Sequence, residues 1–228
     1  MAVFAGPTIS NSGLIIYLDA ANPKSYPGSG NIWYDLSGKE NHATLYNEPV
    51  FANGRALFNG TNEYAQIAYN ATDFDFSLEQ TIFIVMSPTE NDGARRNPYD
   101  QSFGGSGTWT HESNGSISYF YGTNATGGNG TPYTSISSAT VLLNETAFMA
   151  STRKSNLFRR WYKNGTITYD GSGSVYTTVV NSTNNIRIGT GYAGWYQGYI
   201  DLVLVYSRAL STEEIQKNVT ALRGRYGI

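Results

Sequence analysis

The sequence predicts an all-β sandwich, and three observations lead to this fold class. First, 25 of the 228 residues are Gly, 18 are Tyr and only 14% are charged, a composition that favours strands joined by tight turns. Second, short apolar runs recur between turn residues, with the spacing typical of a sandwich. Third, no fixed-period repeat and no change of composition marks a second domain, and undivided all-β sandwiches of this length are common.

Ten apolar runs are the predicted strands. They cover residues 14–18, 56–58, 64–68, 81–86, 117–121, 147–151, 157–163, 167–169, 186–188 and 199–206. Residues 14–18, 81–86 and 200–206 are apolar at consecutive positions instead of alternating with polar ones. We therefore expect these three strands in the middle of the domain, with both faces covered.

Turn residues predict one hairpin and two loops. Asn164 and Gly165 separate two strand-like runs, and a two-residue type I′ turn needs a positive φ angle at both positions, which Asn and Gly tolerate best. Residues 91–110 and 122–138 are dominated by Gly, Asn, Ser and Thr. We expect both of these segments to form long surface loops, where binding residues often lie.

One short helix is predicted close to the end of the chain. Ser211 can accept a hydrogen bond as its N-cap, and Glu214 stands three residues on as the partner of a capping box. The apolar residues on one face are Ile215, Val219 and Leu222. Arg223 and Gly224 have the chemistry of a helix end, so the helix is expected to stop there.

Composition and charge argue against several classes of protein. The net charge is −2, and the longest basic runs are the pairs Arg95-Arg96 and Arg159-Arg160, so nucleic acid is not an expected partner. The absence of cysteine excludes disulfides and thiolate metal sites. No apolar run approaches about 20 residues and the first residues lack a basic region, so neither a membrane span nor a Sec-type signal peptide is expected.

The first 13 residues are too irregular to predict a strand or a helix. We expect an N-terminal arm over residues 1–13 and one domain over residues 14–228. The arm carries isolated apolar side chains, Val3, Phe4 and Ile9. An arm of this kind can dock on a neighbouring subunit and become ordered there.

Three stretches carry a resemblance to a known family. They are GLIIYLDAANPKSYPG at 13–28 followed by WYDLSG at 33–38 and Asn41-His42, LFNGTNEY at 57–64, and GYIDLVLVYSRALSTEEI at 198–215. In order and spacing they resemble the laminin-G-like jelly rolls of the concanavalin A-like lectin and glucanase superfamily, especially the forms in virion proteins of marine bacteriophages and in secreted bacterial proteins. The resemblance implies a jelly-roll sandwich of two antiparallel sheets with one short C-terminal helix.

The sequence lacks the residues that an enzyme of this superfamily would need. A glucanase would carry Glu-x-Asp-x-Glu on one strand, so that two carboxylates line the groove, and this pattern is absent. The nearest pair, Asp73 and Asp75, has no third carboxylate at the required spacing. His42 and His111 are the only possible histidine bases and neither has the context of a nucleophile elbow. We therefore expect a protein that binds but does not catalyse.

Calcium is the cofactor that the fold most often suggests, because loops of Asp, Asn and Gly supply oxygen ligands. The candidate ligands are Asp35 with Asn41 and Asn59 with Glu63, although Asx turns explain the same residues. Asp201 interrupts an apolar strand, and a buried carboxylate needs a partner. We expect it to accept hydrogen bonds from a loop or to pair with an Arg, in preference to binding a metal.

Sugar binding commonly uses an exposed aromatic platform. Tyr192, Trp195 and Tyr196 lie in a Gly-flanked stretch and are the first candidates, with Trp109 as the second. Packing in the core is the alternative fate of each of these aromatic side chains.

The leading functional hypothesis is a non-enzymatic virion structural protein, a capsid decoration or tail appendage subunit. The observations that support it are the resemblance to phage proteins, a start at Met1 without an export signal, and the absence of the expected catalytic residues. Such a subunit would be multimeric in the assembly, contact the major capsid protein or another virion protein, and have host-surface glycans as a further partner. The alternative is an extracellular carbohydrate-binding or adhesion module of a cellular protein.

Overall fold

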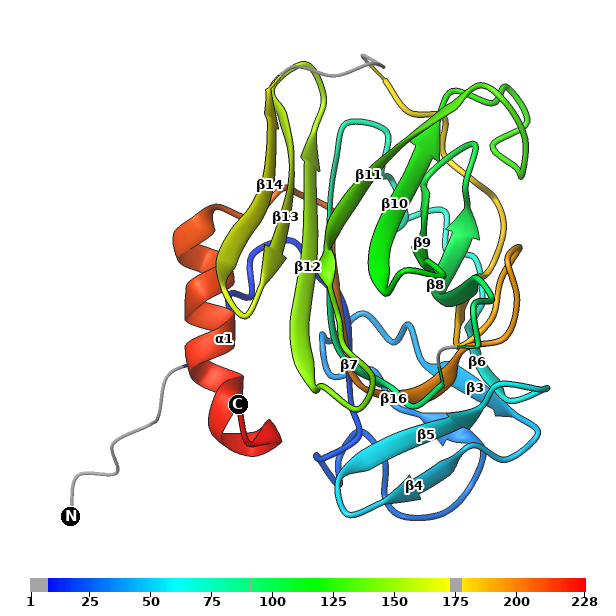
Figure 1. The fold of residues 1–228 in the computed structure, drawn as a ribbon, viewed down its shortest axis with the longest axis vertical. Coiled ribbons are helices and arrows are strands. Elements are labelled where there is room, and N and C mark those ends of the chain that lie inside the picture. Colours follow the sequence, from blue (N-terminus) through cyan, green and yellow to red (C-terminus); the bar gives the residue numbers. More distant parts are fainter. Residues whose placement is uncertain (1–7, 91, 173–177) are drawn as a thin grey trace.

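The computed structural model describes residues 8–90, 92–172 and 178–228, which form two antiparallel sheets packed face to face and one helix (Figure 1). Within this part of the chain each sheet has eight strands. The predicted all-β sandwich with a single C-terminal helix is confirmed.

The first sheet, called sheet A, has the strand order β14-β13-β12-β7-β16-β5-β4, with β1 also paired to β16. Its strands are β1 (Leu14–Asp19), β4 (Val50–Ala52), β5 (Arg55–Asn59), β7 (Glu79–Pro88), β12 (Ala147–Lys154), β13 (Phe158–Lys163), β14 (Thr166–Ser172) and β16 (Gln197–Tyr206). The segments predicted to lie in the middle, within β1, β7 and β16, are adjacent here. That prediction is confirmed.

The second sheet, called sheet B, has the strand order β11-β10-β9-β8-β15-β6-β3-β2. Its strands are β2 (Ile32–Trp33), β3 (Ala43–Tyr46), β6 (Tyr64–Ile67), β8 (Arg96–Ser102), β9 (Gly107–His111), β10 (Ser116–Gly122), β11 (Tyr133–Thr140) and β15 (Ile186–Ile188). Every strand that the apolar runs predicted is present in one of the two sheets.

The central strands of sheet A are apolar on both faces because each face is covered there. Ile82 and Ile84 of β7 belong to the core between the sheets. Phe83 and Val85 point the other way and join a second apolar cluster with Ile215 of the helix. Successive residues of a strand point to opposite faces, so a strand between two apolar layers cannot alternate with polar residues.

The helix α1 (Thr212–Tyr226) lies against sheet A (Figure 1). Its predicted capping box is confirmed, since the Ser211 side chain accepts from the Glu214 N–H and the Glu214 side chain accepts from the Ser211 N–H. The predicted end at Gly224 is wrong, because the chain stays helical up to Gly227, which takes the left-handed conformation. The last turn is held by Tyr226, whose hydroxyl donates to Asp19 of β1.

The predicted hairpin is confirmed, and the two predicted long loops are wrong in part. Asn164 and Gly165 have φ angles of 51° and 83° and join β13 to β14. The segments 91–110 and 122–138 contain β8, most of β9 and part of β11. The pattern predicted loops because Gly, Asn, Ser and Thr dominate both segments, although small polar side chains such as those of Thr108 and Thr110 also fit the outer face of a strand.

Two of the predicted docking residues, Val3 and Phe4, lie outside the described residues. Ile9 is buried in the apolar cluster beneath α1, and the neighbouring Ser10 N–H donates to Asn218 Oδ1 of the helix at 2.8 Å. The expectation that Ile9 docks on another subunit is therefore wrong, because its side chain is already covered by this chain. Among the residues that the structure describes, no helix has the length and hydrophobicity needed to cross a membrane.

Candidate functional site

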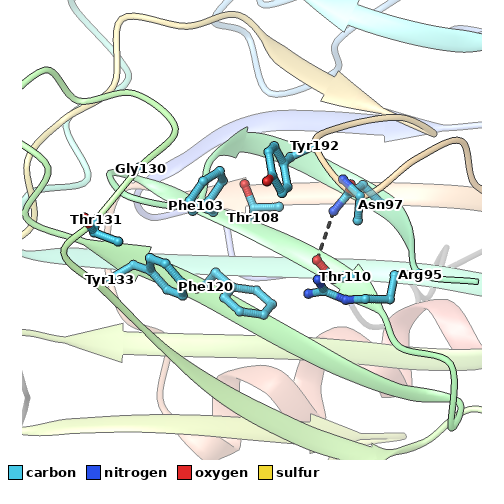
Figure 2. A pocket seen from close by; sticks show the side chains of 11 residues that line it. Arg95, Asn97, Phe103, Thr108, Thr110, Phe120, Gly130, Thr131, Tyr133 and Tyr192 are labelled. Atoms are coloured by element: carbon cyan, nitrogen blue, oxygen red, sulfur yellow. Dashed lines mark hydrogen bonds between the residues drawn. The ribbon is translucent and has the colours of Figure 1, made fainter.

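A groove lies on the face of sheet B that points away from sheet A, over strands β8, β9 and β10 (Figure 2). Its volume is about 280 Å³, and it is lined by Arg95, Asn97, Phe103, Thr108, Thr110, Phe120, Gly130, Thr131, Tyr133, Tyr192 and Ala193. We call it the aromatic groove. Because α1 packs on sheet A, no helix in the described chain covers this part of sheet B.

The floor of the aromatic groove follows from strand alternation. Trp109 and Tyr119 point into the core between the sheets, so their neighbours Thr108, Thr110 and Phe120 point outward. Two hydroxyls and one aromatic ring therefore share a small area of the outer face. Thr108 and Thr110 are almost fully buried and their hydroxyls already hydrogen bond to Asp100 and Asn97. The exposed hydroxyl-bearing side chains of the lining are those of Thr131, Tyr133 and Tyr192.

Asn97 fixes the loop that closes one side of the groove. Its Nδ2 donates to the Trp109 carbonyl at 2.8 Å and to Thr110 Oγ1 at 3.0 Å. Its Oδ1 accepts from the Ala193 N–H at 2.6 Å. Gly191 allows the close approach, since a Cβ there would lie 2.5 Å from Asp100 Cβ. The loop that carries Tyr192 is thereby held on strand β8.

Aromatic side chains form the walls of the groove. The Phe103 ring centroid lies 4.7 Å from that of Tyr192 and 5.4 Å from that of Tyr133. Phe120 lies 5.8 Å from Tyr133, and Figure 2 shows these rings around the same opening. Tyr192 is 70% exposed and Tyr133 is 43% exposed. Both rings keep free surface on which a ligand can stack.

The charge at the end of the groove is balanced. The Arg95 guanidinium lies over the Phe120 ring, 5.5 Å from its centroid. Its Nε also donates to Glu112 Oε2 at 2.7 Å. Since this pair is neutral overall, the aromatic groove itself favours a ligand that presents an apolar face and hydroxyls.

The four predicted sugar-binding aromatics have three different fates. Tyr192 lines the groove. Trp195 is half-buried beside Tyr64, with ring centroids 5.8 Å apart, and is not part of the groove lining. Trp109 and Tyr196 are fully buried, so the expectation that they form an exposed platform is wrong. Trp109 instead packs 4.6 Å from Trp161, a core contact between the two sheets.

Sequence reasoning missed most of the groove because it lies in the segments predicted as loops. The residues missed are Arg95, Asn97, Phe103, Thr108, Thr110, Phe120, Gly130, Thr131, Tyr133 and Ala193. One signal was available in the alternation of small polar and large aromatic residues in Thr108-Trp109-Thr110. A strand with one aromatic face and one hydroxyl face has this pattern.

The first candidate calcium pair comes together but is already hydrogen bonded. Asp35 Oδ1 accepts from the N–H groups of Tyr17 and Ser37, at 2.7 and 2.9 Å. Its Oδ2 accepts from the Ser37 hydroxyl and from the Asn41 N–H. Asn41 Oδ1 accepts from the Asn70 amide. The oxygens of both residues thus satisfy protein donors, which favours the interpretation as an Asx turn.

The second candidate pair also closes a turn. Asn59 Oδ1 accepts from three backbone N–H groups, those of Thr61, Asn62 and Glu63. Glu63 Oε2 accepts from the Asn59 N–H at 2.8 Å, and burial raises the pKa of Glu63. In the described parts of the chain, no group of three His, Cys, Asp or Glu residues could hold a metal ion.

Asp201 has the structural role that the sequence predicted. It is fully buried on β16, where its Oδ2 accepts from Arg55 Nε at 2.9 Å and its Oδ1 accepts from the Ala56 N–H at 3.1 Å. Burial raises the pKa of Asp201 to about 6, although the ion pair with Arg55 opposes this change. The expected pairing with an Arg is confirmed.

Comparison with known proteins identifies the family. The family model described as the concanavalin A-like lectin/glucanases superfamily, laminin-G type, matches residues 59–216. This chain belongs to that superfamily. The matched residues include the groove strands β8, β9 and β10, and also β16 and the start of α1. A search of curated proteins found no match.

The solved structures that match this fold include toxins and sialidases. A structure of botulinum neurotoxin type C, whose title states that its cell entry depends on interaction with two ganglioside molecules, matches with TM-score 0.68 and 14% identity over 93% of this chain and 52% of that chain. The botulinum neurotoxin serotype D binding domain matches with TM-score 0.68 and 14% identity over 92% of this chain and 51% of that chain. Trypanosoma rangeli sialidase gives TM-score 0.68 and 16% identity over 93% and 33%.

The chain therefore spans about half the length of these toxin chains and a third of the sialidase chain. At such low identity the likeness establishes the lectin-like fold, and function has to come from the site itself.

Proposed function

We propose that this protein is a non-enzymatic glycan-binding protein that holds a sugar ring in the aromatic groove. The observation that carries the proposal is the exposed ring of Tyr192, packed against Phe103 in a lining that also contains the exposed, hydroxyl-bearing side chains of Tyr133 and Thr131. A pyranose has an apolar C–H face that stacks on aromatic rings and hydroxyls that hydrogen bond at its rim. The groove offers both kinds of contact within one small cavity.

The structural neighbours support a glycan as the ligand class. One title describes a toxin that interacts with gangliosides, and another describes a sialidase in complex with 2,3-difluorosialic acid. These ligands belong to those proteins. For this chain, the proposal of glycan binding rests on the residues of the aromatic groove.

The lining of the groove supports binding without hydrolysis. A glycosidase of the usual kind places two carboxylates on either side of the scissile bond, and among the described residues that line the groove there is no Asp or Glu. Asp73 and Asp75, the nearest carboxylate pair in the sequence, lie outside the groove lining and accept hydrogen bonds from other residues. Asp73 Oδ2 accepts from the amides of Asn41 and Asn70, and Asp75 Oδ1 accepts from Ser77 and Asn181.

Glycan-array binding of the wild type and Tyr192→Ala tests the groove. We expect the wild type to bind a defined set of glycans and the variant to lose roughly tenfold in affinity, because aromatic stacking contributes about 1 kcal/mol or more. Tyr34→Ala is the matched control, since Tyr34 is also exposed but lies outside the groove. Equal binding by wild type and Tyr192→Ala, or no binding by the wild type, would contradict the proposal.

We further propose that the protein is part of a virion, as a capsid decoration or tail appendage subunit. The resemblance of residues 13–42, 57–64 and 198–215 to phage virion proteins supports this location, and an exposed glycan groove suits a subunit that touches host surfaces. The alternative is an extracellular adhesion module that uses the same groove. Sedimentation separates them, because a virion subunit co-purifies with particles through a density gradient and a free lectin stays in the light fractions.

A further inference from the structure

A second cavity adjoins the aromatic groove on the same face of sheet B. It has a volume of about 400 Å³, and we call it the polar pocket. Its lining is Asp100, Gln101, Asn129, Thr183, Asn184, Asn185 and Arg187. Every one of these side chains is polar or charged, whereas aromatic rings dominate the groove. The two cavities therefore present different chemistry to one ligand.

Two contacts place the polar pocket beside the groove. Thr108 of the groove floor donates from its hydroxyl to Asp100 Oδ1 of the pocket at 2.7 Å. In the loop between β10 and β11, Asn129 lines the pocket and the next residue, Gly130, lines the groove. The two cavities are therefore joined by one hydrogen bond and by two consecutive residues of the loop.

Several groups in the polar pocket are already paired with each other. The Gln101 amide donates to the Asn184 carbonyl at 3.3 Å, and the Asn184 amide donates to the Gln101 carbonyl at 3.2 Å. Asn185 Oδ1 accepts from the Tyr69 N–H at 2.9 Å. Asn185 is therefore left with its NH₂ group, which can only donate.

Arg187 supplies the charge of the pocket. It is exposed on β15, and within the described residues no carboxylate lies close enough to form an ion pair with it. Its cross-strand neighbour is Asp100, but that carboxylate is buried and accepts from Thr108. In the described lining Asp100 is buried and Arg187 is exposed, so the charged group that the pocket presents to solvent is the guanidinium, although the Asp100 carboxylate attracts it.

We propose that the glycan recognised by this protein is acidic, with a carboxylate or sulfate group seated on Arg187 and the Asn185 amide while a neighbouring sugar ring stacks in the aromatic groove. This inference rests on the proposed glycan binding and specifies its substrate class. A guanidinium with free N–H groups binds such anions in a bidentate manner. Neutral glycans with the same ring in the groove would bind more weakly.

The test uses a glycan array of matched pairs that differ only by a carboxylate or a sulfate, followed by calorimetry on the best pair. We expect the wild type to prefer the acidic member by roughly tenfold in low salt. The preference should disappear in Arg187→Gln, because the acidic member loses its contact with the guanidinium, and shrink in 1 M NaCl because salt screens the charge. Arg223→Gln is the control, since Arg223 is exposed on the far-side helix. Pairs with carboxylate and pairs with sulfate identify which anion is preferred.

Equal binding of both members of every pair would overturn the acidic-ligand inference and leave the groove proposal intact. A preference that survives in Arg187→Gln would also overturn it. A wild type that binds no glycan would overturn both proposals.

Inorganic sulfate gives a readout that does not depend on the groove. Sulfate should raise the melting temperature of the wild type and of Tyr192→Ala by more than that of Arg187→Gln. Sulfate also stabilises proteins in general, so the increase measured for Arg187→Gln is subtracted from the other two. Equal increases in all three proteins would contradict an anion site at Arg187, whatever the outcome for Tyr192.

Discussion

At the scale of single residues, two buried carboxylates show how this fold tolerates charge. Asp201 of β16 pairs with Arg55, and Asp19 of β1 accepts from Arg225 and from the Tyr226 hydroxyl at the end of α1. Both aspartates are fully buried. For Asp201, the cost of burial exceeds the gain from its ion pair, so its pKa rises to about 6.

This raised pKa predicts a specific pH dependence of stability. In the unfolded chain an Asp has a pKa near 4, so between about pH 4 and pH 6 the folded state binds more protons at Asp201 than the unfolded state does. The free energy of unfolding contributed by this group therefore falls as the pH rises through that window, by about 3 kcal/mol in total.

Urea unfolding of the wild type and Asp201→Asn across pH 4 to 7 measures the effect. We expect the difference in unfolding free energy between the two proteins to change with pH in this window and to be flat above it. Asp170→Asn is the control, because Asp170 is exposed and its ion pair with Arg160 lies at the surface. Parallel pH profiles for wild type and Asp201→Asn would contradict the prediction.

At the scale of elements, α1 decides which face of the sandwich is free. Its buried residues, Ile215, Asn218 and Leu222, turn toward sheet A. Asn218 also donates to the Tyr206 hydroxyl and accepts from the Ser10 N–H. The helix therefore connects the start of the described chain, the last strand and the end of the chain, and it leaves the face of sheet B that carries the aromatic groove uncovered.

The N-cap of α1 gives a prediction for helix stability. Ser211→Ala removes the side chain that accepts from the Glu214 N–H, and we expect it to lower the free energy of unfolding by about 1 kcal/mol. Ser211→Asp keeps an oxygen acceptor and should cost much less. Guanidinium unfolding measures both, with Ser113→Ala in an exposed turn as the control. A loss from Ser211→Ala no greater than that of the control would argue against the capping role.

At the scale of the whole molecule, the two sheets share one continuous core. Trp109 of sheet B donates from Nε1 to Ser151 Oγ of sheet A, and Trp161 of sheet A donates from Nε1 to the Ile136 carbonyl of sheet B. Arg153 of sheet A, almost fully buried, donates to the Tyr119 hydroxyl of sheet B. These reciprocal bonds across the core couple the sheets, because breaking one sheet leaves buried polar groups of the other without partners.

This coupling predicts that both sheets unfold in one step. Trp33, Trp109 and Trp161 are fully buried, so tryptophan fluorescence reports the core while far-ultraviolet circular dichroism reports all strands. We expect the two denaturation curves to coincide. Trp195→Phe serves as the control, because it removes the one Trp that is partly exposed. Separate midpoints for the two signals would show that the sheets unfold independently.

Much of the fold could be predicted from the sequence, and less of the site. The strands that pass through the core, the capped helix and the Asn164-Gly165 hairpin all have strong local signals. Strands β8, β9 and β11 had no such signal, because Gly, Asn, Ser and Thr dominate the segments that contain them. Of the predicted aromatic residues only Tyr192 lines the groove. Whether a ring is exposed depends on the residues that pack against it in the tertiary structure, and the sequence around Trp109 and Tyr196 does not indicate which residues those are.

The sequence by itself determined the fold class, the family resemblance, the central strands and the cap of α1, because each of these depends on patterns within a few consecutive residues. Only the tertiary structure decided where a ligand can bind. The groove joins residues 95–133 to residues 192–193, and the bond from the Ala193 N–H to Asn97 spans 96 positions of the chain. Antiparallel pairing and packing bring such distant residues together, and no local pattern specifies which of them will meet.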